Sequence, residues 1–171
     1  VVFVLCENTI GSFAGCAAFL NNRVIPLLLD AFIDRQLLWS LVATYKPDYL
    51  YLPECIRDEF SDFNSYLHLH GYLLLKTGYA HQSPVHDNLA LLISTSGSTG
   101  SPKLVRQSYN NLRSNGTAII DYLGINSDER PITTLPMQYT FGFSIINSHL
   151  LVGATTLLTT RTLVEKDFWK F

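Results

Sequence analysis

The sequence predicts an α/β protein with a mostly parallel sheet and flanking helices. Short apolar runs of strand length alternate with segments in which apolar residues recur at helical spacing. Alternation of strands and helices along a chain is typical of parallel crossover units. In addition, 47% of the 171 residues are hydrophobic and 15% are charged. This composition suits one folded unit with a large interior and argues against disorder.

The chain opens with a predicted strand and a predicted helix. Residues 1–5 (VVFVL) form a continuous apolar run, as in strands that are buried on both faces of a parallel sheet. Thr9 is a candidate N-cap of the following helix, because its hydroxyl can accept a hydrogen bond from a first-turn N–H. The expected inward face of this helix comprises Ile10, Phe13, Ala14, Ala17 and Ala18.

A second strand and helix follow, and then a third strand. Residues 24–29 predict a strand, Asp34 is a candidate helix cap, and Pro47 is expected to end the helix. Residues 48–52 predict the third strand. The expected inward face of the second helix comprises Leu37, Leu38, Leu41, Val42 and Tyr45.

The middle of the chain predicts further strands. Residues 53–64 are polar and charged, which indicates a surface connection. Residues 71–77 and 89–94 predict strands. Because residues 105–107 are also expected to be extended, the segment between the last two elements is predicted to join two paired strands.

The last third of the chain returns to alternating elements. Ser108 is a candidate cap of a helix that runs through Leu123. Residues 141–152 predict another helix, and residues 132–135 and 155–158 predict short strands on either side of it.

Residues 94–103 (STSGSTGSPK) have the composition of a phosphate-binding loop. Gly97 and Gly100 lack a Cβ and therefore allow the backbone to approach a ligand closely. Lys103 supplies a positive charge. Hydroxyls that can donate to phosphate oxygens or bind magnesium come from Ser94, Thr95, Ser96, Ser98, Thr99 and Ser101.

The end of this loop separates it from the commoner GxxxxGK[ST] phosphate loop, in which the lysine directly follows the second glycine. Here Ser101 and Pro102 stand between Gly100 and Lys103. Proline disfavours helix at the residue before it, so the loop is expected to run extended into Lys103. A flexible Gly/Ser linker is the alternative. It is disfavoured because the loop is short and apolar segments flank it.

Residues 95–103 (TSGSTGSPK) resemble the phosphate-loop signature of the adenylate-forming enzymes. This superfamily comprises acyl-CoA synthetases, luciferases and the adenylation domains of peptide synthetases. The match is specific because every position of the signature is a defined residue type. The family usually has glycine after the lysine, where this chain has Leu104. This departure is expected to alter local packing more than ATP binding.

Other motifs extend the resemblance over nearly the whole chain. Residues 1–8 and 12–26 are similar to the family's opening strand and small-residue helix. Residues 135–142 (LPMQYTFG) are similar to a later motif, in which an aromatic residue or a histidine commonly occupies the place of Tyr139. The resemblance implies that residues 1–171 form a single partial domain, an incomplete large N-terminal domain of the adenylate-forming fold.

The resemblance implies a ligase that is similar to acyl-CoA synthetases. ATP and a carboxylic acid would form an acyl adenylate and pyrophosphate, and the acyl group would then pass to the thiol of coenzyme A or a carrier protein. Lys103 and Thr99 are the expected catalytic residues, with Thr99 in contact with Mg²⁺. Tyr139 and Phe141 are expected to line the pocket for the acid. The residues implied in ATP binding are Thr95, Ser96, Gly97, Ser98, Thr99, Gly100 and Lys103.

Several family motifs are expected to lie beyond residue 171, together with the remaining domains of the same chain. They are the aromatic-Gly-x-Thr-Glu segment, a ribose-binding aspartate and a C-terminal lysine. The 171 residues also begin without Met, so we expect a part of a longer protein that is inactive alone. A non-catalytic nucleotide-binding or regulatory module is one alternative. The other is a structural α/β domain with a coincidental loop.

Charge, hydropathy and cysteine spacing limit the possible binding partners and the cellular compartment of the protein. A net charge of −2 offers no basic surface for nucleic acid, and no run approaches the ~20 apolar residues of a membrane span. Cys6, Cys16 and Cys55 lack CxxC spacing and are expected to be reduced thiols in a cytoplasmic protein. His68 and His70 alternate, but no third ligand has matching spacing, so ordinary histidines are favoured over a metal pair.

Overall fold

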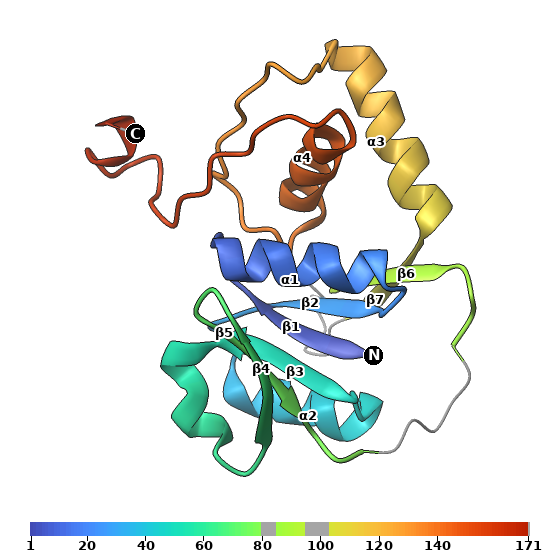
Figure 1. The fold of residues 1–171 in the computed structure, drawn as a ribbon, viewed down its shortest axis with the longest axis vertical. Coiled ribbons are helices and arrows are strands. Elements are labelled where there is room, and N and C mark those ends of the chain that lie inside the picture. Colours follow the sequence, from blue (N-terminus) through green and yellow to red (C-terminus); the bar gives the residue numbers. More distant parts are fainter. Residues whose placement is uncertain (80–84, 95–102, 171) are drawn as a thin grey trace.

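The computed structural model describes residues 1–79, 85–94 and 103–170. These residues form a seven-stranded sheet in the order β4-β5-β3-β1-β2-β6-β7, with helices on both faces (Figure 1). The strands are β1 (Val2–Cys6), β2 (Pro26–Asp30), β3 (Tyr49–Pro53), β4 (Asn64–Leu69), β5 (Tyr72–Lys76), β6 (Leu89–Ser94) and β7 (Leu104–Ser108). The predicted α/β class is confirmed.

The helices divide between the two faces of the sheet. They are α1 (Ile10–Asn21), α2 (Arg35–Tyr45), α3 (Tyr109–Leu123) and α4 (Thr140–Leu151), with short 3₁₀ segments η1 (Glu54–Phe60) and η2 (Phe168–Lys170). The first core cluster joins one face of the sheet to α1 and α4, with α3 packed at its border. The second joins the opposite face to α2 and η1. No helix among the described residues is long and apolar enough to cross a bilayer.

The centre of the sheet is parallel and its edges are antiparallel. Strand β1 lies between β2 and β3, and β6 lies beside β2, all in parallel pairs. The antiparallel pairs are β3 with β5, β5 with β4, and β6 with β7. In the central register Cys6 lies opposite Asp30, and Leu28 lies opposite Ile93. The carboxyl ends of β1, β2 and β6 are therefore nearly level.

The three helix caps predicted from the sequence are confirmed. The Thr9 hydroxyl accepts a hydrogen bond from the backbone N–H of Ser12, and the Asp34 carboxylate accepts one from the N–H of Leu37 at 2.9 Å. Ser108 forms a reciprocal capping box with Asn111. Each cap satisfies N–H groups that have no partner inside the helix.

The predicted inward face of α1 is wrong in part: Phe13 packs, partly buried, against the first core cluster, but the residues that lie closest to the sheet are others. Ile10 is 61% exposed, and the buried positions are Gly11, Ser12, Gly15 and Cys16. The reason is the sheet beneath the helix, where Tyr51 and Tyr72 stand on the face that α1 covers. A Cβ on Gly15 would overlap the Tyr51 ring, and a Cβ on Gly11 would lie 2.6 Å from Cδ2 of Tyr72. Small residues therefore face the sheet, although apolar periodicity favoured larger ones.

Some predicted connections also differ from the structure. The predicted strands at 132–135 and 155–158 reduce to one parallel bridge between Ile132 and Leu157, because no other described strand lies beside them. The predicted surface connection at 53–64 contains η1, whose Phe60 is buried. Strand β4 was not predicted; it is mostly exposed, so it lacks the alternation of buried and exposed positions that marks a strand with one buried face.

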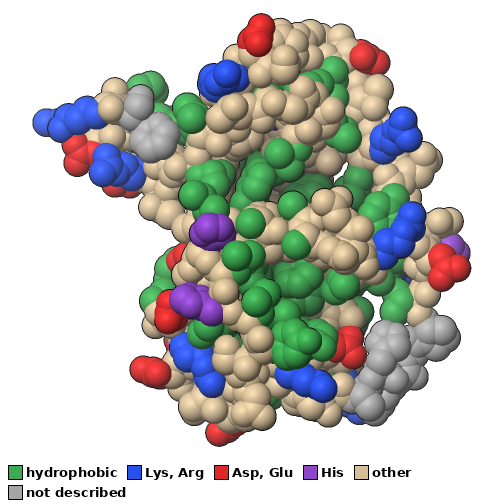
Figure 2. All heavy atoms as spheres, in the orientation of Figure 1, with side chains coloured by type: hydrophobic (Ala, Val, Ile, Leu, Met, Phe, Trp, Pro, Cys, Tyr) green, Lys and Arg blue, Asp and Glu red, His purple; other side chains and the backbone are tan. Residues whose placement is uncertain are grey.

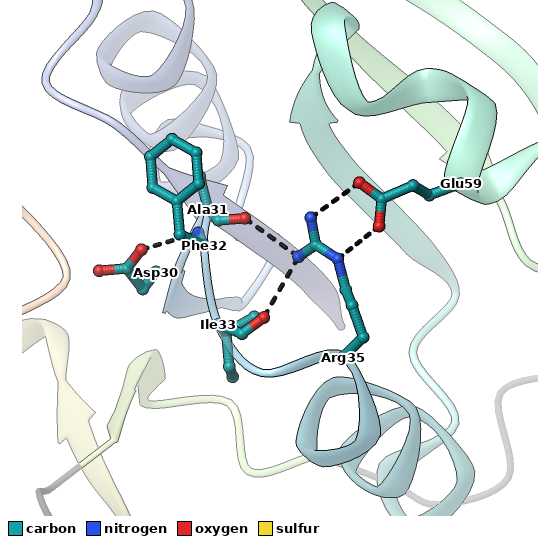
Figure 3. Close-up of polar contacts among 6 residues, drawn as sticks. All are labelled: Asp30, Ala31, Phe32, Ile33, Arg35 and Glu59. Atoms are coloured by element: carbon teal, nitrogen blue, oxygen red, sulfur yellow. Dashed lines mark hydrogen bonds and ion pairs between the residues drawn. The ribbon is translucent and has the colours of Figure 1, made fainter.

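The loop after β2 is held by one arginine (Figure 3). The Arg35 guanidinium donates to the carbonyls of Ala31 at 3.1 Å and Ile33 at 3.3 Å. Its other N–H groups form a bidentate pair with Glu59, at 2.6 Å and 3.1 Å. The Asp30 carboxylate accepts from the backbone N–H of Phe32 at 2.8 Å in the same loop. These bonds restrain the backbone where β2 ends.

A substitution in α1 tests the close approach of this helix to the sheet. Alanine normally stabilises a helix interior relative to glycine by about 1 kcal/mol. Gly15→Ala should instead destabilise the protein by about 1–3 kcal/mol, because the new methyl group overlaps the Tyr51 ring. Urea denaturation measures the difference. The control is Ala18→Gly at an exposed position of the same helix, which should cost about 1 kcal/mol. A more stable Gly15→Ala variant would show that the helix can move away.

The Arg35–Glu59 ion pair predicts that the Tm difference between the unaltered protein and a Glu59→Gln variant depends on pH. The hydrogen bond from Arg35 holds the pKa of Glu59 below its usual value of 4.5. The pair therefore stabilises the fold above that usual value, and the stabilisation is lost as the pH falls through the lowered pKa. Glu59→Gln should lower the Tm at pH 7, and its Tm should lie closer to that of the unaltered protein at pH 3, as the pH falls toward the lowered pKa. Arg35→Met should lower the Tm at both pH values, because it also removes the bonds to Ala31 and Ile33. A constant Tm difference for Glu59→Gln across this range would contradict the assignment.

Candidate functional site

The candidate site lies at the carboxyl edge of the parallel strands. In open α/β sheets, ligands bind outside the carboxyl ends of the strands. At this edge β1 ends at Cys6, β2 at Asp30 and β6 at Ser94. Strand β1 is followed by the polar residues 7–9 (ENT), and β6 by residues 95–103, which are rich in hydroxyls and glycine.

The predicted phosphate loop begins at this edge. Ser94 is the last residue of β6, Lys103 directly precedes β7, and Ser94 pairs with Leu104 in an antiparallel ladder. The prediction that the loop joins two paired strands is therefore confirmed. Lys103 is exposed. The remaining predicted ATP-binding residues lie outside the described residues, namely Thr95, Ser96, Gly97, Ser98, Thr99 and Gly100.

Leu104, which stands where the family usually has glycine, has a place in the packing. It begins β7 and packs, partly buried, against the second core cluster. That cluster includes Leu27 and Leu29 of β2. The side chain thus helps to fasten the edge strand β7 to the sheet beside the loop.

The second predicted motif, residues 135–142, lies at the same edge. Asn8 donates from its side-chain amide to the carbonyl of Leu135 at 3.3 Å. Gln138 is 4% exposed and donates from Nε2 to Oδ2 of Asp30 at 2.7 Å. These bonds connect the motif to the ends of β1 and β2. Asp30 and Gln138 were not predicted from the sequence, although a carboxylate at the end of the apolar run of β2 is a usable signal.

Gly142 allows the motif to turn into α4. A Cβ at this position would overlap the carbonyl of Pro136, so a larger residue would push the motif away from the helix. Phe143 is 6% exposed and belongs to the first core cluster. Tyr139 and Phe141 are 52% and 67% exposed at the start of α4. Their role in binding the acid stays a prediction.

The described part of this edge is rich in acceptors. Burial raises the pKa of Glu7, and the nearby Asp30 carboxylate raises it further. Asn8 Oδ1 and Gln138 Oε1 are buried and have no hydrogen-bond partner among the residues that the structure describes. Such oxygens suit N–H or O–H donors or a cation, and they do not suit phosphate oxygens.

The described residues contain no preformed cluster of metal-binding side chains. No group of three or more His, Cys, Asp or Glu side chains is placed to hold an ion there. His68 instead pairs with Glu54, with 3.0 Å between Nε2 and Oε2. His70 lies in the turn between β4 and β5.

A pocket of about 440 Å³ lies between the two strands that flank the phosphate loop and the helices α3 and α4. Two strand residues line it: Ile93 of β6 and Gln107 of β7, from the strands on either side of the phosphate loop. Its helix walls come from α3 and from the first turns of α4. Figure 2 shows the surface hollowed between α1 and the α3–α4 pair, where hydrophobic side chains line a neighbouring, smaller pocket between α1 and α4. The helix residues that line the pocket are Asn111, Leu112, Ser114, Asn115, Thr140, Phe143, Ser144 and Asn147.

Solved structures share this fold. MatB from Rhodopseudomonas palustris, in its apo form, superposes with a TM-score of 0.75 at 20% identity over 94% of this chain and 35% of its own. O-succinylbenzoate coenzyme A synthetase (MenE) from Bacillus subtilis in complex with AMP superposes with a TM-score of 0.73 at 19% identity. The match covers 99% of this chain and 45% of MenE. The same enzyme in complex with ATP and magnesium ion superposes with a TM-score of 0.71 at 19% identity, over 99% of this chain and 46% of MenE.

The chain therefore spans about a third to a half of the length of these enzymes. No curated protein sequence matches it. The sequence model of AMP-binding enzymes matches residues 40–171, which include both motifs of the site. With this match over most of its length, the chain belongs to the AMP-binding enzyme family.

Proposed function

We propose that this chain is the first part of an ATP-dependent ligase that activates a carboxylic acid as an acyl adenylate. One observation carries the proposal: the strands that flank the phosphate loop and the helix that follows the LPMQYTFG motif line one pocket. Membership of the AMP-binding enzyme family supports it. A reaction between ATP and a second substrate needs such neighbouring sites.

The loop is proposed to hold the phosphates of ATP. Attack of a carboxylate on a phosphate brings two anions together, so positive charge and hydrogen-bond donors must offset their repulsion. Ser96, Ser98 and Thr99 would donate to the β and γ phosphates, and Lys103 would supply the charge. Mg²⁺ would neutralise part of the phosphate charge when bound, with the Thr99 hydroxyl as its contact in the loop. MenE, a structural neighbour, has been solved with ATP and magnesium ion.

The acid is proposed to lie beside the start of α4, near Tyr139 and Phe141. The acyl group would then pass to a thiol, and coenzyme A is the proposed acceptor because MenE is a coenzyme A synthetase. A carrier-protein thiol is the other acceptor of this chemistry. The remaining domains of the same chain would complete the active site, and we expect the enzyme to act in the cytoplasm.

Substitutions in the loop test the proposal in the full-length protein. Lys103→Ala and Thr99→Ala should each lower kcat/KM for acid-dependent ATP–pyrophosphate exchange by about 10²–10³-fold, the usual cost of losing one group that stabilises the transition state. The control is Lys76→Ala, an exposed lysine at the amino edge of the sheet, which should leave exchange unchanged. Undiminished exchange in both loop variants would overturn the assignment. ATP binding without exchange by the unaltered protein would favour a regulatory module.

The 171 residues alone should not form an acyl adenylate. They span only 35–46% of the neighbouring enzymes, so groups that complete the site are expected elsewhere in the protein. Exchange by the isolated chain should fall to the background rate under conditions in which the full-length protein is active. Circular dichroism should accompany the assay to show that the isolated chain is folded. Robust adenylate formation by the folded chain would contradict the prediction.

A further inference from the structure

We propose that the pocket between β6, β7, α3 and α4 holds the tail of the acid, and that it selects an uncharged tail with hydrogen-bonding groups. The inference rests on the proposed ligase function and adds the class of acid. It follows from the position of the pocket and from the side chains that line it.

The pocket is placed to receive the part of the acid that lies away from the reacting carboxylate. Ile93 precedes the last residue of β6, so one wall directly adjoins the phosphate loop. Thr140 and Ser144 belong to the first turns of α4, immediately after Tyr139. An acid whose carboxylate meets the phosphates near the loop can therefore extend its tail between these walls.

The volume limits the size of the tail. About 440 Å³ is near the lower end of the roughly 300–1,000 Å³ of ligand pockets. Such a space suits a short chain or a single ring. A long alkyl chain would extend beyond it.

The amides in the lining offer both donors and acceptors. Asn111 uses its Oδ1 to accept from the backbone N–H and hydroxyl of Ser108, which leaves its Nδ2 for other partners. Asn147 donates from Nδ2 to the carbonyl of Leu112 at 2.8 Å, which leaves its Oδ1 as an acceptor. The Gln107 amide has no hydrogen bond to another described residue and contributes both a donor and an acceptor.

The lining also disfavours two other classes of tail. None of the described residues that line the pocket is charged, so a carboxylate or ammonium tail would lose water without gaining a counter-ion. A purely alkyl tail would cover amide groups and leave them unpaired, and such unpaired groups are costly. A hydroxyl, a keto group or a carboxamide satisfies the same amides. Hydroxy, keto and carboxamide acids are therefore the expected substrates.

Asn115 is the residue that tests the inference most cleanly. It lines the pocket from the middle of α3, its side chain is exposed, and its one contact in the lining is a long one, 3.5 Å from Oδ1 to Oγ of Ser144. Asn111 is less suitable because it also caps α3. Asn110 lies on the same helix, is exposed and does not line the pocket. Asn110→Leu is therefore the matched control for Asn115→Leu.

The experiment measures ATP–pyrophosphate exchange by the full-length protein with linear acids of four to eight carbons. Each chain length is supplied with a methyl, a hydroxymethyl, a carboxamide or a carboxylate end. Among acids of the best length, the hydroxyl or carboxamide form should exceed the methyl and carboxylate forms in kcat/KM by about tenfold, the effect of one satisfied hydrogen bond. Asn115→Leu should reduce this preference by about tenfold without changing the KM for ATP, and Asn110→Leu should leave it unchanged. Thermal melting checks that both variants are folded.

The outcomes separate the two proposals. Exchange that is fastest with a methyl-ended or carboxylate-ended acid would overturn the inferred class and leave the ligase function in place. A raised KM for ATP in Asn115→Leu, with an unaltered acid preference, would also overturn it, because the amides would then bind the adenine ring. Exchange with none of the linear acids, and with none of the single-ring acids that carry the same four ends, would overturn the ligase function and the inference with it.

Discussion

Parallel pairing of β1, β2 and β6 is the constraint on which the rest of the site depends. Parallel strands bring their carboxyl ends to one edge, and the register here leaves those ends nearly level. The segments that follow the strands, separated by tens of residues in sequence, therefore meet. The antiparallel strand β7 then returns from the edge beside β6, so the phosphate loop is held at both ends by one ladder. A loop anchored in this way loses less conformational freedom when it binds a ligand than a free linker would.

Long-range polar bonds add the second motif to this edge. The two oxygens of the Asp30 carboxylate accept from the Phe32 backbone and from the Gln138 side chain. Gln138 is almost fully buried, so breaking its bond to Asp30 would leave polar groups without partners. Arg35 restrains the loop that follows β2 through two backbone carbonyls and Glu59. The motif that precedes α4 is thus positioned by the ends of β1 and β2.

Local signals in the sequence were reliable where one residue determines the local geometry. Thr9, Asp34 and Ser108 were identified as caps because a hydroxyl or carboxylate before an apolar periodic run has few other roles. Strand β6 was predicted with its observed bounds from one apolar run. Apolar periodicity failed on α1, because the size of Tyr51 and Tyr72 decides which face of the helix can approach the sheet. Strand β4 escaped prediction because it is held by its partner β5 and buries little of its own surface.

The sequence by itself determined the α/β class, the phosphate loop and the likeness to adenylate-forming enzymes, because these depend on local pattern and on residue types at short spacing. Only the tertiary structure decided which distant residues share the site. The bond between Asp30 and Gln138 spans 108 positions of the chain, and the pocket joins residues from β6, β7, α3 and α4. Such contacts follow from strand order and helix packing, which no short segment contains. The chemistry of the loop is therefore readable from its residues, whereas the shape and polarity of the neighbouring pocket follow from the fold.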